Sequence, residues 1–222
     1  AHHMAEPGLL FWDNIIRESP ADCYADLGFR TISTNPCSEI PLSAFDSCRL
    51  MLLNAFSYVE NPFTDKAKFN YELFSEHAGI CRRLMDDLVD LEVECIDRII
   101  AKVNSDPEDE AFRERELQLW NDIKAAAMNG RRTGTGLTAV GDTLAALGIP
   151  YASEEGIATN SRIYKTLKLA AYRSSVDMAR EVGPFPIWAH ERESENPFLS
   201  RIKEDRKSTR LNSSHVSESR MP

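Results

Sequence analysis

The spacing of apolar residues along the middle of the chain predicts a long helix over residues 76–104. Within this range, apolar side chains recur at steps of three and four residues, which places them on one helical face. The face consists of Ile80, Leu84, Leu88, Leu91, Cys95 and Ile99. Cys81 and Cys95 belong to the same helix and are about four turns apart, too far to share a metal ion. We therefore expect both cysteines to be core residues.

Similar signals predict two more long helices. Residues 106–109 break the chain, and a helix over 110–128 follows, which Asn129-Gly130 would end as a left-handed cap. Another helix is predicted over 155–181, ending at Gly183-Pro184. The expected apolar positions of the two helices are Phe112, Leu119, Trp120 and Ile123, and then Ile163, Leu167, Ala171 and Met178.

Strand candidates are few. The pattern favours strands at residues 9–12, 30–33 and 50–59. A few strands with long helices between them indicate an α/β fold. Glycines at 134–136 suit a phosphate-binding loop, but the segment fits neither the dinucleotide nor the Walker pattern. Close packing of the helix that follows is the preferred interpretation.

Composition narrows the function. The chain has 222 residues, of which 42% are hydrophobic and 27% charged, as expected of a globular protein. Its net charge of −9 argues against a nucleic-acid surface, and no apolar run reaches the roughly 18 residues of a membrane span. Five cysteines without a signal peptide suit a reducing cytoplasm. The acidic residues between 86 and 94 suggest a solvated helix face, and we assign no metal site.

Candidate chemistry lies in the segment Asn35-Pro36-Cys37-Ser38-Glu39. Pro36 and Pro41 disfavour a helix and favour an extended backbone. Asn35, Cys37 and Glu39 would then point to the same side, because side chains alternate along an extended chain. Taken alone, Cys37 is more often a packing residue than a reactive one. A carboxylate beside the thiol changes that balance, because a buried carboxylate without a partner is costly.

These residues resemble a known family. The segments 33–42 and 46–50, the latter containing Cys48, are similar to the active-site loop of the ribonucleotide reductase catalytic chain. Within the family, Asn-Pro-Cys-x-Glu is typical of the adenosylcobalamin-dependent (class II) enzymes, whereas class I chains more often have Leu between the Asn and the Cys. Further resemblance lies, in order, at residues 6–11, 83–92, 130–148 and 183–186, so that it covers roughly residues 1–205.

The resemblance implies a role for each site residue. Cys37 would carry the transient thiyl radical that takes the 3′ hydrogen of the ribose, and Glu39 would be the general base on the 3′ hydroxyl. Asn35 would hydrogen-bond the sugar hydroxyls. Cys48 would be one half of a redox-active disulfide whose partner in the family lies far upstream. The implied cofactor is adenosylcobalamin, from which the radical would reach Cys37 through a 5′-deoxyadenosyl group.

The resemblance also implies an architecture and partners. Residues 1–206 would form part of a ten-stranded α/β barrel with the Cys37 loop threaded through its centre. The substrate would be a ribonucleoside di- or triphosphate, and the reductant a protein of the thioredoxin or glutaredoxin type. The family's phosphate-binding loop has no counterpart in this chain. We therefore expect the isolated chain to be inactive, with aggregation-prone barrel edges.

Residues 207–222 are rich in Ser, Arg and Asn and show no apolar periodicity. We expect them to be a disordered tail of cloning origin rather than native sequence, with a native flexible tail as the alternative.

Two other functions stay open. One is a class I ribonucleotide reductase chain, which uses a separate radical-generating subunit. The other is a non-catalytic helical interaction module in which Cys37 and Glu39 are structural.

Overall fold

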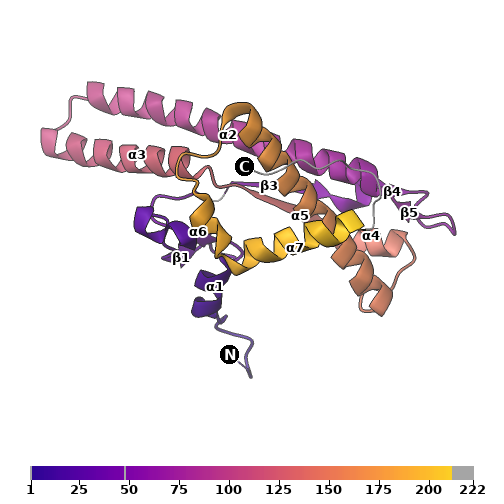
Figure 1. The fold of residues 1–222 in the computed structure, drawn as a ribbon. Coiled ribbons are helices and arrows are strands. Elements are labelled where there is room, and N and C mark those ends of the chain that lie inside the picture. The colour runs from indigo at the N-terminus through magenta and orange to yellow at the C-terminus, as the bar shows by residue number, and fades with distance from the viewer. Residues whose placement is uncertain (1, 48, 212–222) are drawn as a thin grey trace. The chain divides into compact units, whose positions relative to one another are not determined.

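The computed structural model describes residues 2–47 and 49–211, with the backbone alone described for residues 205–211. It divides the chain into two compact units (Figure 1). The first combines Ala1–Ala44 with Ile187–Pro222, and the second is Phe45–Pro186.

The first unit joins the two ends of the described chain. Its elements are α1 (Trp12–Glu18), η1 (Asp22–Leu27), β1 (Ser33–Thr34), β2 (Pro41–Leu42), α6 (His190–Ser194) and α7 (Pro197–Leu211). The buried Tyr24 links them, because its hydroxyl accepts from the Ala189 N–H at 3.2 Å and donates to Glu193 at 3.2 Å. An ion pair between Arg192 and Asp26, with N–O distance 2.8 Å, adds a second link. These contacts pair η1 with the segment around α6.

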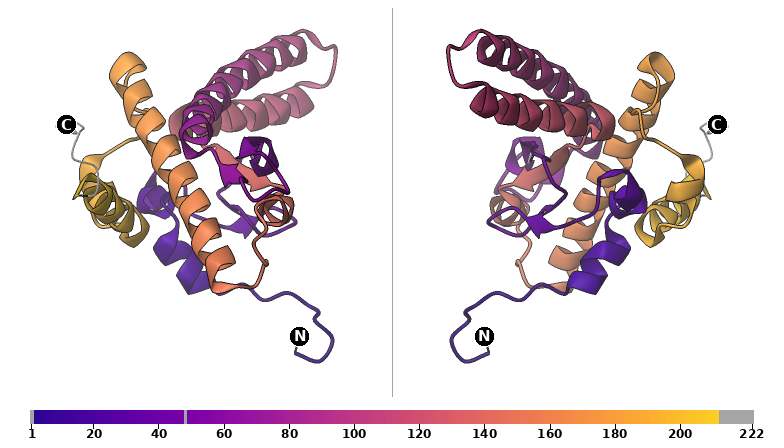
Figure 2. Two further views of the ribbon diagram at one scale, coloured as in Figure 1. Left: turned by 90° about the vertical axis from the view of Figure 1, so that its right-hand side faces the viewer. Right: turned by 90° about the vertical axis from the view of Figure 1, so that its left-hand side faces the viewer.

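The second unit is built on long helices. Its elements are β3 (Leu50–Asn54), η2 (Ala55–Tyr58), β4 (Val59–Glu60), β5 (Lys68–Phe69), α2 (Tyr71–Ser105), α3 (Glu110–Gly130), β6 (Gly134–Thr138), α4 (Val140–Ala146) and α5 (Glu154–Val182). The helices α2 and α3 run side by side as an antiparallel hairpin, which is visible in the views of Figures 1 and 2. β3 and β6 pair in parallel from Leu50↔Gly134 to Asn54↔Thr138, so the α2–α3 hairpin forms the crossover that a parallel pair requires.

Local signals fix where the helices begin. The side chain of Asn70 accepts from the Leu73 N–H at 3.0 Å and caps α2, and Ser153 accepts from the Gly156 N–H at 3.0 Å and caps α5. The first turn of α5 also packs tightly, since a Cβ at Gly156 would lie 2.7 Å from the Pro150 carbonyl oxygen. The bounds of α2, α3 and α5 confirm, within a few residues, the predicted helices over 76–104, 110–128 and 155–181. The predicted cap at Asn129-Gly130 is displaced, because α3 includes Gly130 and the left-handed residue is Arg131, at φ 41°.

The core of the second unit is aromatic. Tyr58, Phe69 and Phe74 lie with ring centroids 5.0–6.0 Å apart, and Ile163 and Leu167 of α5 belong to the same cluster. Such ring contacts add to the gain from burial. The helix α5 thus buries Ile163, Leu167 and Met178 as the sequence predicts, but Ala170 in place of Ala171.

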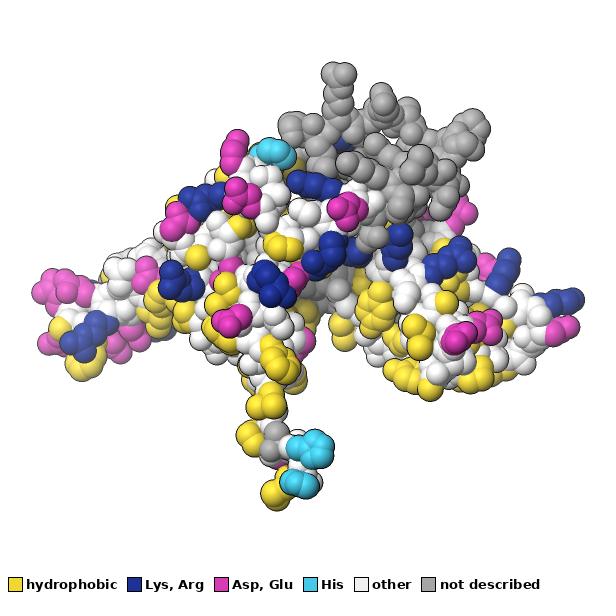
Figure 3. Space-filling model, turned by 60° about the horizontal axis from the view of Figure 1, so that its bottom comes forward, with side chains coloured by type: hydrophobic (Ala, Val, Ile, Leu, Met, Phe, Trp, Pro, Cys, Tyr) yellow, Lys and Arg dark blue, Asp and Glu magenta, His cyan; other side chains and the backbone are white. Residues whose placement is uncertain are grey.

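The predicted apolar face of α2 is wrong in its main positions. Ile80, Leu84, Leu88 and Leu91 are 42–54% exposed. The buried positions of α2 are Phe74, Ala78, Cys81, Met85, Val89, Ile96 and Val103. Both sets recur at helical spacing, so periodicity alone could not choose between them. Elsewhere too, hydrophobic side chains, drawn yellow in Figure 3, reach the surface at several places on the face shown.

The predicted strands are confirmed only in part. The range 50–59 contains β3 but then turns into η2, and 30–33 overlaps the two-residue β1 by one position. The range 9–12 is not a strand, because α1 begins at Trp12. Residues 134–136 are the start of β6 rather than a loop, and a Cβ at Gly136 would lie 2.7 Å from a Leu52 methyl group. The close packing at Gly136 is therefore against β3 and not against a following helix.

The helix α7 ends at Leu211, so it includes residues 207–211 of the predicted tail. The rest of the predicted tail lies outside the described residues. The strands of the described chain form three two-stranded sheets and no closed barrel.

Candidate functional site

The Asn35–Glu39 segment connects the two strands of a small antiparallel hairpin. β1 and β2 pair through Ser33↔Leu42 and Thr34↔Pro41, which leaves residues 35–40 as the connection. The Asn35 N–H donates to the Ile40 carbonyl at 3.2 Å, and the Ser38 N–H donates to the Asn35 carbonyl at 2.9 Å. The segment is thus a closed turn with Pro36 at its second position, where a fixed φ is favourable.

The prediction of an extended backbone is wrong here. Ser38 has φ 66°, in the left-handed region, so regular alternation of side chains is lost between Cys37 and Glu39. The turn still brings Asn35, Cys37 and Glu39 together within one six-residue connection. Cys37 and Glu39 are exposed, whereas Asn35 is half-buried.

The base of the hairpin is anchored by Asp22, a residue that the sequence pattern does not single out. Asp22 accepts from the Thr31 N–H at 3.0 Å and from the Thr31 hydroxyl at 2.5 Å. Thr31 is 3% exposed and lies two residues before β1. The contact fixes the entry to the turn against η1. Local sequence gives no signal for it, because the two residues are nine positions apart and belong to different elements.

Cys48 lies outside the described residues, but its neighbours are held by ion pairs. Asp46, whose side chain is 2% exposed, pairs with Arg132. Arg49 pairs with Glu92 of α2 and donates to the Arg132 carbonyl at 3.1 Å. The segment before β3 is therefore tied to α2 and to the end of α3 by charged contacts that the sequence did not predict.

The acidic stretch of α2 is not simply a solvated face. Asp86 accepts from Arg131 at 2.9 Å, and Asp90 accepts from the same guanidinium at 2.7 Å. Hydrogen bonds to Asp90 and then to Asp86 raise the pKa of Arg131 above its usual range. Arg82, beside Asp86, has its pKa lowered by burial. The prediction of a solvated face therefore fails for Asp86 and for Glu92, which bind arginines from distant parts of the unit.

Within residues 2–47 and 49–204, no three His, Cys, Asp or Glu side chains gather in a metal-binding arrangement. None of the helices described combines the length and apolar character needed to cross a bilayer.

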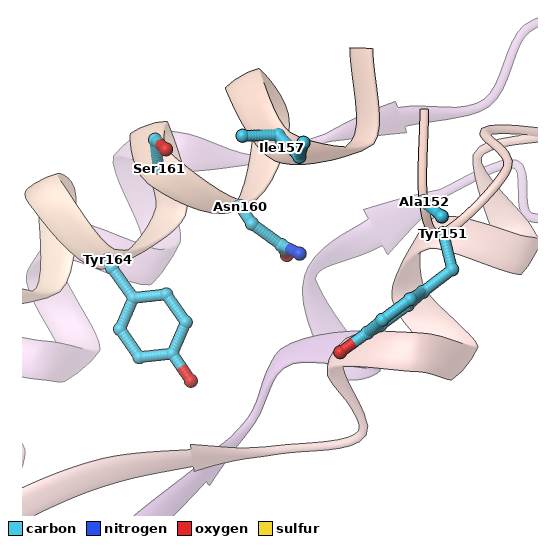
Figure 4. Close-up of a pocket in the computed structure, with 6 residues that line it drawn as sticks. All are labelled: Tyr151, Ala152, Ile157, Asn160, Ser161 and Tyr164. Atoms are coloured by element: carbon cyan, nitrogen blue, oxygen red, sulfur yellow. The ribbon is translucent and has the colours of Figure 1, made fainter. Parts of the chain in front are cut away.

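The second unit also has an open groove of about 520 Å³ at the start of α5 (Figure 4). The side chain of Asn160 points into the space between the rings of Tyr151 and Tyr164. Its Oδ1 is buried and has no hydrogen-bond partner among the described residues. The groove is further lined by Ala152, Ile157 and Ser161.

The described cysteines differ sharply in their surroundings, which predicts selective alkylation. Cys37 and Cys95 are exposed, so the prediction that Cys95 is a core residue is wrong, whereas Cys81 is buried as predicted. Burial, followed by the charge of Glu193, raises the pKa of the Cys23 thiol to about 11. Since the thiolate is the nucleophile, only roughly a thousandth of Cys23 is reactive at pH 8.

We therefore expect iodoacetamide at pH 8 to modify Cys37 and Cys95 first, as followed by peptide mass spectrometry. Raising the pH from 8 to 10 should accelerate Cys23 by roughly a hundredfold, because the thiolate fraction rises tenfold per pH unit below the pKa. Equal rates for Cys23 and Cys37 at pH 8 would show that the packing of η1 is looser than described.

Comparison with known proteins gives the family. The family model described as "Ribonucleotide reductase, barrel domain" matches residues 1–219. The chain therefore belongs to the ribonucleotide reductase barrel-domain family. The match runs past residue 206, where the sequence predicted the domain to end.

Individual relatives carry a more specific name. A "Vitamin B12-dependent ribonucleoside-diphosphate reductase" of Mycobacterium tuberculosis (strain CDC 1551 / Oshkosh) is 30% identical over 192 residues, which is 86% of this chain. A protein of the same name from Thermoplasma acidophilum is 29% identical over 184 residues, or 83% of the chain. The chain spans 23% and 20% of the lengths of these two relatives.

Proposed function

We propose that this chain is part of the catalytic barrel of an adenosylcobalamin-dependent ribonucleotide reductase, which reduces ribonucleotides to 2′-deoxyribonucleotides. The observation that carries the proposal is the single turn that joins Asn35, Cys37 and Glu39, with the thiol exposed, in a chain of this family. The names of the relatives support dependence on vitamin B12.

Each side chain of the turn has a chemical task in this proposal. Cys37, as a thiyl radical, takes the 3′ hydrogen atom of the ribose, and Glu39 accepts the proton of the 3′ hydroxyl. Asn35 donates a hydrogen bond to a sugar hydroxyl and keeps the ring in register. Cys48 is proposed as one half of the dithiol that becomes oxidised as the substrate is reduced.

The proposed cofactor imposes one requirement on this chain. When adenosylcobalamin is bound, the chemistry it supplies is homolysis of a carbon–cobalt bond. The hydrogen atom that has to be removed is that of the Cys37 thiol, so this group must be reachable from outside the turn. Cys37 fits that requirement because it is exposed at the tip of the hairpin.

The fold and partners follow the same proposal. The parallel β3–β6 pair with a helical crossover suits one unit of a larger α/β barrel of ten strands. A ribonucleoside di- or triphosphate would be the substrate, and a thioredoxin- or glutaredoxin-type protein the reductant. The four described cysteines are free, which suits a reducing cytoplasm.

The test is turnover of a full-length reductase that carries this segment. We expect reduction of a ribonucleotide with adenosylcobalamin and a dithiol alone, without a second protein. Activity only after a separate radical-generating subunit is added would overturn the proposal in favour of a class I enzyme. No activity under either condition would favour the interaction module.

A further inference from the structure

We propose that Asn35 is a positioning residue whose side-chain oxygen holds the Cys37–Glu39 turn closed. The closure of the turn does not depend on the function proposed above.

The contact that carries the proposal spans the turn. The Ile40 N–H donates to Asn35 Oδ1 at 2.9 Å. Because a backbone N–H needs an acceptor, this bond fixes which end of the amide is the oxygen. The backbone of Asn35 makes two more bonds across the same turn, to Ile40 and to Ser38. Asn35 therefore closes the turn at three points, one of them through its side chain.

The other features of the hairpin restrain the turn only weakly, so the bond from Ile40 to Asn35 matters. Ser38 sits in the left-handed region at φ 66°, which a residue with a Cβ adopts at a cost. The two strands contribute only two residue pairs, so the ladder adds little restraint of its own. The hydrogen bonds from Thr31 to Asp22 hold the base of the hairpin, but they do not involve residues 36–39. Loss of the Asn35 side chain is expected to release the tip while the base stays fixed.

The bond from Ile40 to Asn35 matters for the chemistry because it holds Cys37 and Glu39 in position. Cys37 and Glu39 are exposed and lie between the two residues that the bond joins. A reacting thiol and a base must be held close to their productive geometry, because small displacements lower the rate steeply.

The test compares Asn35→Ala with Asn35→Asp in the 222-residue chain. Asp keeps an acceptor oxygen for the Ile40 N–H and lacks the amide nitrogen, whereas Ala lacks both. Hydrogen exchange of the Ile40 amide, followed by NMR, should lose protection by on the order of tenfold in Asn35→Ala and stay within about twofold of the original in Asn35→Asp at pH 7. In Asn35→Asp the protection should also weaken below roughly pH 4, because an ionised acceptor binds more strongly than a neutral one.

A second measurement follows the motion of the side chain at position 37. A nitroxide attached to Cys37, with Cys48 and Cys95 replaced by Ser, should move faster in Asn35→Ala and at the original rate in Asn35→Asp. Asn14→Ala is the matched control, because Asn14 is an exposed asparagine of α1 in the same unit. It should change neither measurement.

Two results would overturn the proposal: unchanged Ile40 protection and label motion in Asn35→Ala, or equal loosening in the Ala and Asp variants. Neither measurement requires nucleotide reduction. If the exchange results hold while the cobalamin-dependent assay fails, the turn closure stands and the reductase function falls.

Discussion

Replacing Cys37 by Ser is expected to abolish nucleotide reduction in a full-length reductase that carries this segment. A hydroxyl hydrogen is held more tightly than a thiol hydrogen, so Ser cannot serve as the radical that takes the ribose 3′ hydrogen. We expect kcat to fall on the order of a thousandfold or more, because a group that reacts in the transition state is removed. Substrate affinity should stay close to the original, since Cys37 is given no binding role.

The matched control is Cys95→Ser. Cys95 is also exposed and free, but it lies on α2, and its sulfur accepts a hydrogen bond from Arg98 at 2.9 Å. It should leave both kcat and substrate affinity unchanged. If Cys37→Ser turned over at the original rate, the enzymatic interpretation of the turn would be wrong, and Cys37 and Glu39 would have to be structural.

Residue types and their spacing single out Asn35, Cys37 and Glu39 as candidates for chemistry, but they do not predict the geometry of the segment. The proline positions suggested an extended strand, whereas the backbone closes into a turn at Ser38. Proline restricts its own φ and the residue before it, and it leaves later residues free to turn. The hydrogen bond from Ile40 to the Asn35 side chain decides the outcome.

Ion pairs between residues far apart in the sequence could not be predicted either. Asp86 and Arg131 are 45 positions apart, and Asp46 and Arg132 are 86 apart. A run of acidic residues on a helix predicts solvent exposure unless the partner is known. Here the partners are consecutive arginines at the end of α3, which the α2–α3 hairpin brings back beside α2. Only the tertiary arrangement identifies them.

The fold was predicted best where local signals decide. The breaks before α3 and after α5 depend on proline, glycine and capping side chains, and the predicted positions hold. The buried face of α2 does not depend on local signals. This helix has two apolar stripes, and the one that packs contributes Phe74 and Ala78 to the core cluster that also holds Ile163 and Leu167 of α5.

The two stripes of α2 give the second large prediction, in a pair of adjacent residues. Met85 is completely buried, whereas Leu84 is 48% exposed. Met85→Ala should lower the free energy of unfolding by about 2–5 kcal/mol, because it removes buried methylene groups and leaves a cavity. Leu84→Ala should cost less than about 1 kcal/mol, since most of its surface stays in water. Helix propensity does not separate the two, because Leu and Met are similar in this respect.

Urea unfolding of the 222-residue chain, followed by circular dichroism, measures both changes against the same reference. The midpoint should fall clearly for Met85→Ala and little for Leu84→Ala, with an unchanged slope in each case. The sequence pattern alone makes the opposite prediction, since it places Leu84 in the core. Equal costs for the two variants would mean that the stripe containing Leu84 is covered in solution, and that the exposure of this face of α2 is incorrect.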